Sequence, residues 1–294
     1  MKLLTLFAAL VSVFTVSAQQ TVTNGAGASD IINQYGSTFK NAGGSILHDK
    51  VNVYIIFYGN WSSTQSQQEQ TTFMHFIDHI SISPWFNLLK QYTDGNGKAV
   101  TGPLNLAAAV NDAGSHSLNL TTTIHKQIVL DAVNSGYLSP TNRLDNSGLY
   151  IIMGAANVQD ADFCKTNCGY NSWSDEFQYM YIGYPGACPE SCIPAVNMNT
   201  SPNNSPAMDA AITIFSHEIQ DILTDPRGDA WEIPTQSGIT VELGDFCSGE
   251  GTSKDQFGNM TQDQQSGSYN LELAGSKYLV QTIFNLETKQ CALA

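Results

Sequence analysis

The sequence predicts an α+β fold with α/β-like character: one mixed β-sheet, helices that flank it, and loops held by disulfide bonds. Two runs of apolar and β-branched residues, 52–58 and 148–154, are bounded by glycine and have the length of buried strands. Helix-like segments lie between such runs, and alternating strands and helices are typical of a sheet with parallel strands. Six cysteines in a chain of 294 residues supply the cross-links.

The other elements follow from the same periodicities. A helix is expected over residues 65–92, with an interruption at Ser83-Pro84, because proline disfavours helix at the residue before it. No repeat or linker divides the chain, so one domain over residues 45–294 is predicted. Two further strands are expected over residues 104–110 and 179–184, and two further helices over residues 123–134 and 206–225. A C-terminal β segment is expected over residues 277–284.

The first 18 residues have the features of a secretory signal peptide. Lys2 supplies the positive charge, residues 3–16 form an apolar run, and Val16-Ser17-Ala18 is a small-residue cleavage site. Residues 19–44 are rich in Gly, Ala, Ser and Asn and lack periodicity, which predicts a flexible N-terminal arm. No segment is long enough for a membrane span, so we expect a secreted, extracellular protein.

Secretion determines how the cysteines are interpreted. In an oxidising compartment an even number of cysteines indicates disulfide bonds. Cys164-x3-Cys168 and Cys188-x3-Cys192 are two closely spaced pairs, and Cys247 with Cys291 could tie the C-terminal segment back. The spacing leaves the connectivity open.

The polar and acidic composition suits a glycoprotein outside the cell. A net charge of −14 argues against nucleic acid and against an anionic membrane as a partner. An extracellular protein or peptide is the expected partner. Five Asn-x-Ser/Thr sequons mark expected surface positions, at Asn60, Asn119, Asn199, Asn203 and Asn259.

One segment, 205–226, carries the only constellation of catalytic character. Ser205 can cap a helix that has Pro206 at its first position, and Asp225-Pro226 ends it. A core-facing stripe at 4-3-4-3 spacing is formed by Met208, Ile212, Phe215, Ile219 and Ile222.

His217 and Asp221 lie four residues apart on the other side of this helix, beside Glu218. In the related His-Glu-x-x-His pattern two histidines hold zinc and the glutamate activates water, and zinc also accepts a carboxylate oxygen. We therefore expect zinc to be held by His217, Asp221 and Glu242. Glu218 would be the catalytic general base, and Asp245 would orient a ligand. A helix with an exposed polar face explains the same spacing, and that alternative stays open.

Other catalytic patterns are weaker or absent. His75 and His79 also stand four residues apart on an expected helix, but without an adjacent glutamate, and boundary histidines of an amphipathic helix explain them. The sequence has no Gly-x-Ser-x-Gly pentapeptide and no P-loop, which argues against a serine hydrolase of that type and against nucleotide binding.

Short motifs stand in a specific order along the chain: Gly43-Gly44, Tyr58-Gly59-Asn60-Trp61, Phe163-Cys164-x3-Cys168-Gly169, Cys188-Pro189-x2-Cys192, His217-Glu218, Asp225-Pro226, Ala230-Trp231, Glu242-x2-Asp245-x-Cys247, Tyr269-Asn270 and Leu279-Val280-Gln281. In order and spacing the chain resembles the EXORDIUM / phosphate-induced protein 1 family over residues 43–284. Two positions depart from the family pattern. Tyr170-Asn171 stands where the family often has a histidine, and Asp221 stands where it usually has glutamate, one methylene longer.

The resemblance implies a secreted protein of the cell wall or apoplast, linked to growth and nutrient responses. The 206–225 helix is also similar in pattern to the zincin-like active helix of zinc metallopeptidases, which implies a zinc-dependent peptidase. The competing hypothesis is a non-catalytic extracellular regulator, or a module that binds protein or cell-wall polysaccharide. Calcium would then be the alternative ion at the acidic residues. Sugars would stack on exposed tryptophans, for which the candidates are Trp61, Trp85, Trp173 and Trp231.

Overall fold

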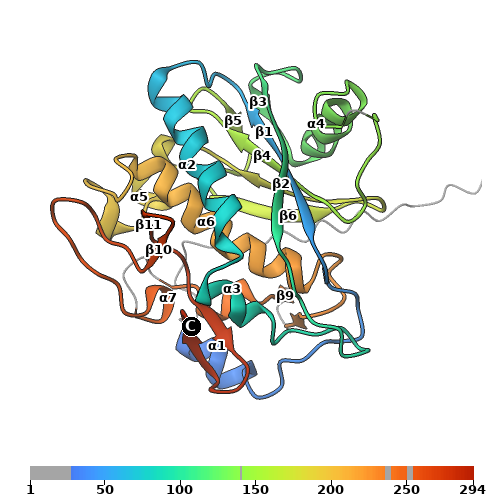
Figure 1. Ribbon diagram of the computed structural model, residues 1–294, viewed down its shortest axis with the longest axis vertical. Coiled ribbons are helices and arrows are strands. Elements are labelled where there is room, and N and C mark those ends of the chain that lie inside the picture. The colour runs from blue at the N-terminus through green and yellow to red at the C-terminus, as the bar shows by residue number, and fades with distance from the viewer. Residues whose placement is uncertain (1–27, 140, 236–239, 250–253) are drawn as a thin grey trace, which may run out of the picture.

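Five strands form the central sheet of a computed structural model that describes residues 28–139, 141–235, 240–249 and 254–294 (Figure 1). Their order is β2-β1-β4-β7-β6. The strands β2, β1, β4 and β7 are mutually parallel, and β6 runs antiparallel to β7 at one edge. The mixed-sheet α+β prediction is confirmed. The strand bounds are β1 Val51–Tyr58, β2 Leu104–Asp112, β4 Leu149–Gly154, β6 Gly169–Trp173 and β7 Gln178–Ile182.

The central strands are buried on both faces. Ile55 and Ile56 of β1 point to opposite faces, and both are fully buried. A sheet covered on both sides requires nearly continuous apolar strands, which explains why the runs at β1 and β4 were recognisable from the sequence. The polar strand β6 was not predicted, because the sequence Gly-Tyr-Asn-Ser-Trp has no such run.

Helices cover both faces of this sheet. The chain steps from β1 outward to β2 and then back across to β4, and right-handed crossovers place the two connecting segments on opposite faces. The helix α4 accordingly lies apart from α2 and α6 (Figure 1). Phe73 of α2 packs edge-on against Phe215 of α6, with ring centroids 5.5 Å apart. The main helices are α2 Thr64–Ile80, α3 Pro84–Leu89, α4 Thr122–Asn134 and α6 Pro206–Thr224.

The expected interruption of the first long helix is confirmed. The Ser63 side chain accepts a hydrogen bond from the amide of Ser66 at the start of α2. Ser83 accepts one from the amide of Phe86, 3.0 Å away, at the start of α3. Each serine therefore begins a separate helix, and Pro84 occupies the first position of the second.

Short elements complete the fold. The expected C-terminal β segment consists of two small hairpins, because β11 pairs with β10 and β12 with β13. The short helices are α1 Ala28–Tyr35, η1 Pro185–Ala187, α5 Pro189–Cys192, η2 Ala195–Asn197, η3 Gly244–Cys247 and α7 Lys254–Phe257. The short strands are β3 Asn119–Leu120, β5 Gln159–Asp160, β8 Ile233–Pro234, β9 Thr240–Val241, β10 Leu271–Leu273, β11 Ser276–Tyr278, β12 Ile283–Asn285 and β13 Gln290–Ala292.

The segment expected to be a flexible arm differs from that expectation where it is described. It forms helix α1, which packs against η3. The ring of Phe39 is buried with its centroid 4.3 Å from that of Phe246. The apolar residues of this segment pack against a partner about 200 residues later in the chain, and composition alone does not show that partner. The expected signal peptide lies outside the described residues.

All six cysteines are paired. Cys164 bonds to Cys188, Cys168 to Cys192, and Cys247 to Cys291. The two Cys-x3-Cys segments are thus cross-linked to each other rather than closed individually, which resolves the connectivity that the spacing left open. Within the part of the chain that the structure describes, no helix has the length and apolarity needed to cross a membrane.

Candidate metal centre on helix α6

The polar face of α6 lies inside the protein. Ser205 caps the helix through a 3.2 Å hydrogen bond from the amide of Met208, as the sequence predicts. Every residue of the helix from Ala207 to Thr224 is buried. Neighbours surround it: α2, β6, β7, η1, η3 and β11 all contact it. The alternative of an exposed polar helix face is therefore wrong.

Three side chains of this face converge. Ligand atoms of His217, Glu218 and Asp221 all lie within 4.8 Å of one another, and among the described residues this is the only such group of three or more. The Nε2 atom of His217 is 3.5 Å from Oδ2 of Asp221. The exposed fractions of the three residues are 1%, 1% and 0%, so the group is shielded from bulk water.

The segment around η3 brings further carboxylates to the same place. Oδ1 of Asp245 lies 3.9 Å from Nε2 of His217, and its Oδ2 accepts a hydrogen bond from the amide of Glu242, 3.0 Å away. Glu242 is buried but is not part of the converging group. Of these two expected participants, Asp245 thus has the observed contact with the imidazole.

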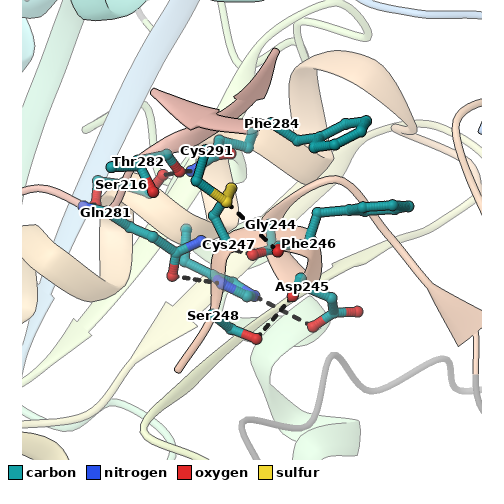
Figure 2. Close-up of a disulfide and its surroundings, with 12 residues drawn as sticks. Ser216, Gly244, Asp245, Phe246, Cys247, Ser248, Gln281, Thr282, Phe284 and Cys291 are labelled. Carbon is teal, nitrogen blue, oxygen red and sulfur yellow. Dashed lines mark hydrogen bonds and ion pairs between the residues drawn. A yellow bond between two sulfur atoms is a disulfide. The ribbon is translucent and has the colours of Figure 1, made fainter. Parts of the chain in front are cut away.

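Gln281 determines which nitrogen of His217 faces the carboxylates. Its Nε2 donates to the carbonyl oxygen of Gly244 at 2.5 Å, so its Oε1 is left to accept from Nδ1 of His217 at 3.1 Å (Figure 2). Nδ1 therefore carries the hydrogen, and in the neutral ring Nε2 presents its lone pair toward Asp221 and Asp245. A lone pair facing two carboxylates is favourable only with a proton or a metal cation between them.

Gly244 allows the η3 segment to approach the helix. Its amide donates a 2.6 Å hydrogen bond to Oδ1 of Asp221. A Cβ atom at this position would lie 3.0 Å from both carboxylate oxygens of Asp221 and 3.0 Å from Cε1 of His217. Glycine suits this position, because a side chain here would require Asp221 or His217 to shift by a few tenths of an ångström.

Asn171 of β6 holds Glu218, and the sequence prediction missed it. Its Nδ2 donates to Oε2 of Glu218 at 3.2 Å. The available signal was the departure at Tyr170-Asn171, where a polar residue stands in place of the family histidine. Burial raises the pKa of Glu218 to about 7, against the partial opposition of His217 and of this hydrogen bond.

The surrounding carboxyl groups lack a compensating charge. Burial, together with the neighbouring carboxylates, raises the pKa of Asp221 and that of Glu242 well above their ordinary values. Oδ2 of Asp221 is buried and accepts no hydrogen bond from the described residues. Within the same part of the chain, no lysine or arginine forms an ion pair with the carboxylates of this cluster. The arrangement therefore fits a bound divalent cation with nitrogen and oxygen ligands.

Comparison with known proteins bears on this site. The family model described as "Phosphate-induced protein 1 conserved region" matches residues 39–294. The chain belongs to this family. Among curated proteins, Protein EXORDIUM-like 3 of Arabidopsis thaliana is 28% identical to the chain over 275 residues, which cover 84% of this chain and 80% of the relative.

A second relative supports the same family assignment. Protein EXORDIUM-like 5 of Arabidopsis thaliana is 24% identical over 273 residues, which cover 82% of this chain and 73% of the relative. No solved structure matches the chain. The family match includes α6 and the η3 segment, so the candidate metal centre lies entirely within the region that defines the family.

Proposed function

We propose that the chain is a secreted zinc protein whose helix α6 carries a hydrolytic site for extracellular peptides. The observation that supports it best is the buried group of His217, Glu218 and Asp221, in which an imidazole nitrogen and an unpaired carboxylate oxygen stand 3.5 Å apart. Three disulfide bonds support an oxidising compartment.

His217 and Asp221 would hold the ion. Asp245 is the nearest further carboxylate to the imidazole, and Glu242 of the same segment is a buried carboxyl group whose raised pKa a bound cation would lower. A nitrogen ligand beside carboxylate oxygens favours zinc over calcium, which prefers oxygen ligands alone. Bound zinc would supply a Lewis acid that lowers the pKa of a water molecule bound to it to near neutrality.

Glu218 would accept and return the proton. Its pKa of about 7 suits a group that exchanges a proton at neutral pH. Asn171 donates to Oε2 of Glu218 and so holds the carboxyl group in a fixed orientation. Burial strengthens each electrostatic interaction in the site because water is excluded.

Metal content and turnover test the proposal separately. We expect about one zinc ion per chain by mass spectrometry of the secreted protein, retained in Glu218→Gln and lost in His217→Ala. Turnover of a peptide library should be abolished in Glu218→Gln. His116→Gln, which alters a histidine paired with Asp131 away from the site, is the matched control.

Two outcomes contradict different parts of the proposal. Absence of zinc from the wild-type protein and from every variant rejects the metal site. Bound zinc with turnover that survives Glu218→Gln rejects the catalytic role of Glu218 and leaves the metal site in place.

Burial favours a second candidate function, a non-catalytic extracellular binding protein or growth regulator with a structural ion. The central residues are almost wholly inaccessible, as in a site that stabilises rather than reacts. This candidate predicts that zinc or calcium raises the unfolding temperature without any peptide turnover. Sugar stacking has little support, because three of the four candidate tryptophans, Trp61, Trp85 and Trp231, are buried, and Trp173 alone is partly exposed.

A further inference from the structure

A pair of histidines lies on helix α2, remote in sequence from the α6 cluster. His75 and His79 are both partly exposed and stand four residues apart, so they share one face of the helix. Their rings are stacked, with centroids 4.2 Å apart and planes inclined by 27°. Two imidazoles are thus held together at the surface.

Each ring is anchored through its Nδ1 atom. Nδ1 of His79 is 2.8 Å from the carbonyl oxygen of His75. A carbonyl oxygen only accepts, so Nδ1 of His79 carries the hydrogen and Nε2 has the lone pair in the neutral ring. Nδ1 of His75 is 2.7 Å from the hydroxyl of Tyr278, whose oxygen can accept in the same way. Neither Nε2 atom has a hydrogen-bond partner among the described residues.

We propose that the Nε2 atoms of His75 and His79 form a surface site for a divalent transition-metal ion of the copper and zinc type. Histidines that bind metals usually donate their other nitrogen to a carbonyl or similar acceptor, and both rings here have such an acceptor in reach. Imidazole is a preferred ligand of these ions, and copper binds most tightly in the divalent series.

The charge near the pair supports a cation. Asp78, which is exposed, lies between the two histidines in sequence and contributes negative charge. The net charge of −14 attracts cations to the surface as a whole. Two protein ligands leave the remaining coordination positions to water, so the site suits reversible binding rather than a permanent structural ion.

Tyr278 links this site to the C-terminal half of the chain. It lies on β11, in the hairpin with β10 that contacts α2 (Figure 1). Its hydroxyl orients the His75 ring without coordinating the ion. Tyr278 is therefore a positioning residue, and removing its hydroxyl should weaken binding without removing either ligand.

Copper titration of the full-length secreted protein, stripped with a chelator, tests the site. Calorimetry should detect a Cu²⁺ ion whose electron paramagnetic resonance spectrum carries hyperfine coupling from two nitrogens. We expect the affinity to fall by at least about tenfold in His79→Gln and in His75→Gln, and less in Tyr278→Phe. His116→Gln should bind copper as the wild type does.

The outcome in His217→Ala separates this site from the α6 cluster. The two-nitrogen copper signal should persist in that variant, whatever happens to zinc. Unchanged copper affinity in both His75→Gln and His79→Gln, with folding verified by circular dichroism, would overturn the proposal. So would a signal that His116→Gln removes.

Discussion

Replacing Asp221 by asparagine changes the charge of the α6 cluster and leaves its shape nearly intact. Oδ1 of Asp221 accepts the amide of Gly244 at 2.6 Å, and asparagine oxygen can keep this bond. Oδ2 has no donor and faces Nε2 of His217 at 3.5 Å. The asparagine amino group would occupy that place and donate to the imidazole lone pair.

The expected effect on the metal-free protein is stabilisation. A buried polar atom left unpaired costs about 1–3 kcal/mol, and Asp221→Asn removes that cost together with the repulsion from neighbouring carboxylates. The unfolding temperature of the metal-free variant should rise by roughly 2–12 °C, given the usual 2–4 °C per kcal/mol for a domain of about this size. Zinc should reverse the order, because amide oxygen is a poorer ligand than carboxylate.

Thermal unfolding at pH 7.5, once with chelator and once with zinc, measures both effects. Asp131→Asn is the matched control, because it makes the same change at a carboxylate on the surface. A metal-free Asp221→Asn protein less stable than the wild type would refute the reasoning, since the carboxylate would then be a net stabiliser without a cation.

Three further perturbations test other parts of the structure. Burial raises the pKa of Glu218 to about 7 and that of Asp225 to about 6, above the ordinary carboxyl value of about 4. Between pH 4 and 7 the folded metal-free protein therefore binds more protons than the unfolded protein. Its free energy of unfolding should fall as pH rises from 4 to 7, and denaturant unfolding that shows greater stability at pH 7.5 than at pH 5 would contradict this. Gly244→Ala should cost about 1–3 kcal/mol and weaken zinc binding, because the new Cβ meets the site at 3.0 Å; unchanged calorimetric stability and zinc affinity would argue against that contact. Replacing Cys247 and Cys291 by serine should lower stability by roughly 2–4 kcal/mol, because the bond closes a loop with a sequence separation of 44; a matched denaturant midpoint would show that the cross-link is dispensable.

Local patterns sufficed for the elements whose signals are local. The buried strands β1 and β4 are apolar throughout, and helices α3 and α6 have serine caps followed by proline. The polar edge strand β6 has neither signal. The helix α1 lies in a segment whose composition suggests a flexible arm, since the surface that it packs against is formed by η3 far along the chain.

The same distinction applies to the site. His217, Glu218 and Asp221 lie within one helical turn or so, and their convergence follows from helix geometry. Gly244 and Gln281 join them from sequence separations of 23 and 64 residues from their partners on α6. Hydrogen bonds over such separations leave no periodic trace in a single sequence, so neither the burial of the polar face nor the tautomer of the imidazole was predictable.

The position of Gln281 also orders events during synthesis. The ribosome synthesises α6 before the segment that covers it. The side-chain amide of Gln281, which accepts the Nδ1 hydrogen of His217, follows 64 residues later. Through that interval the acidic face of the helix has neither Gln281 nor the Cys247–Cys291 cross-link that holds the covering segments together (Figure 2). Assembly of the centre is therefore a late, post-translational step, completed when the C-terminal segment docks and the last disulfide closes.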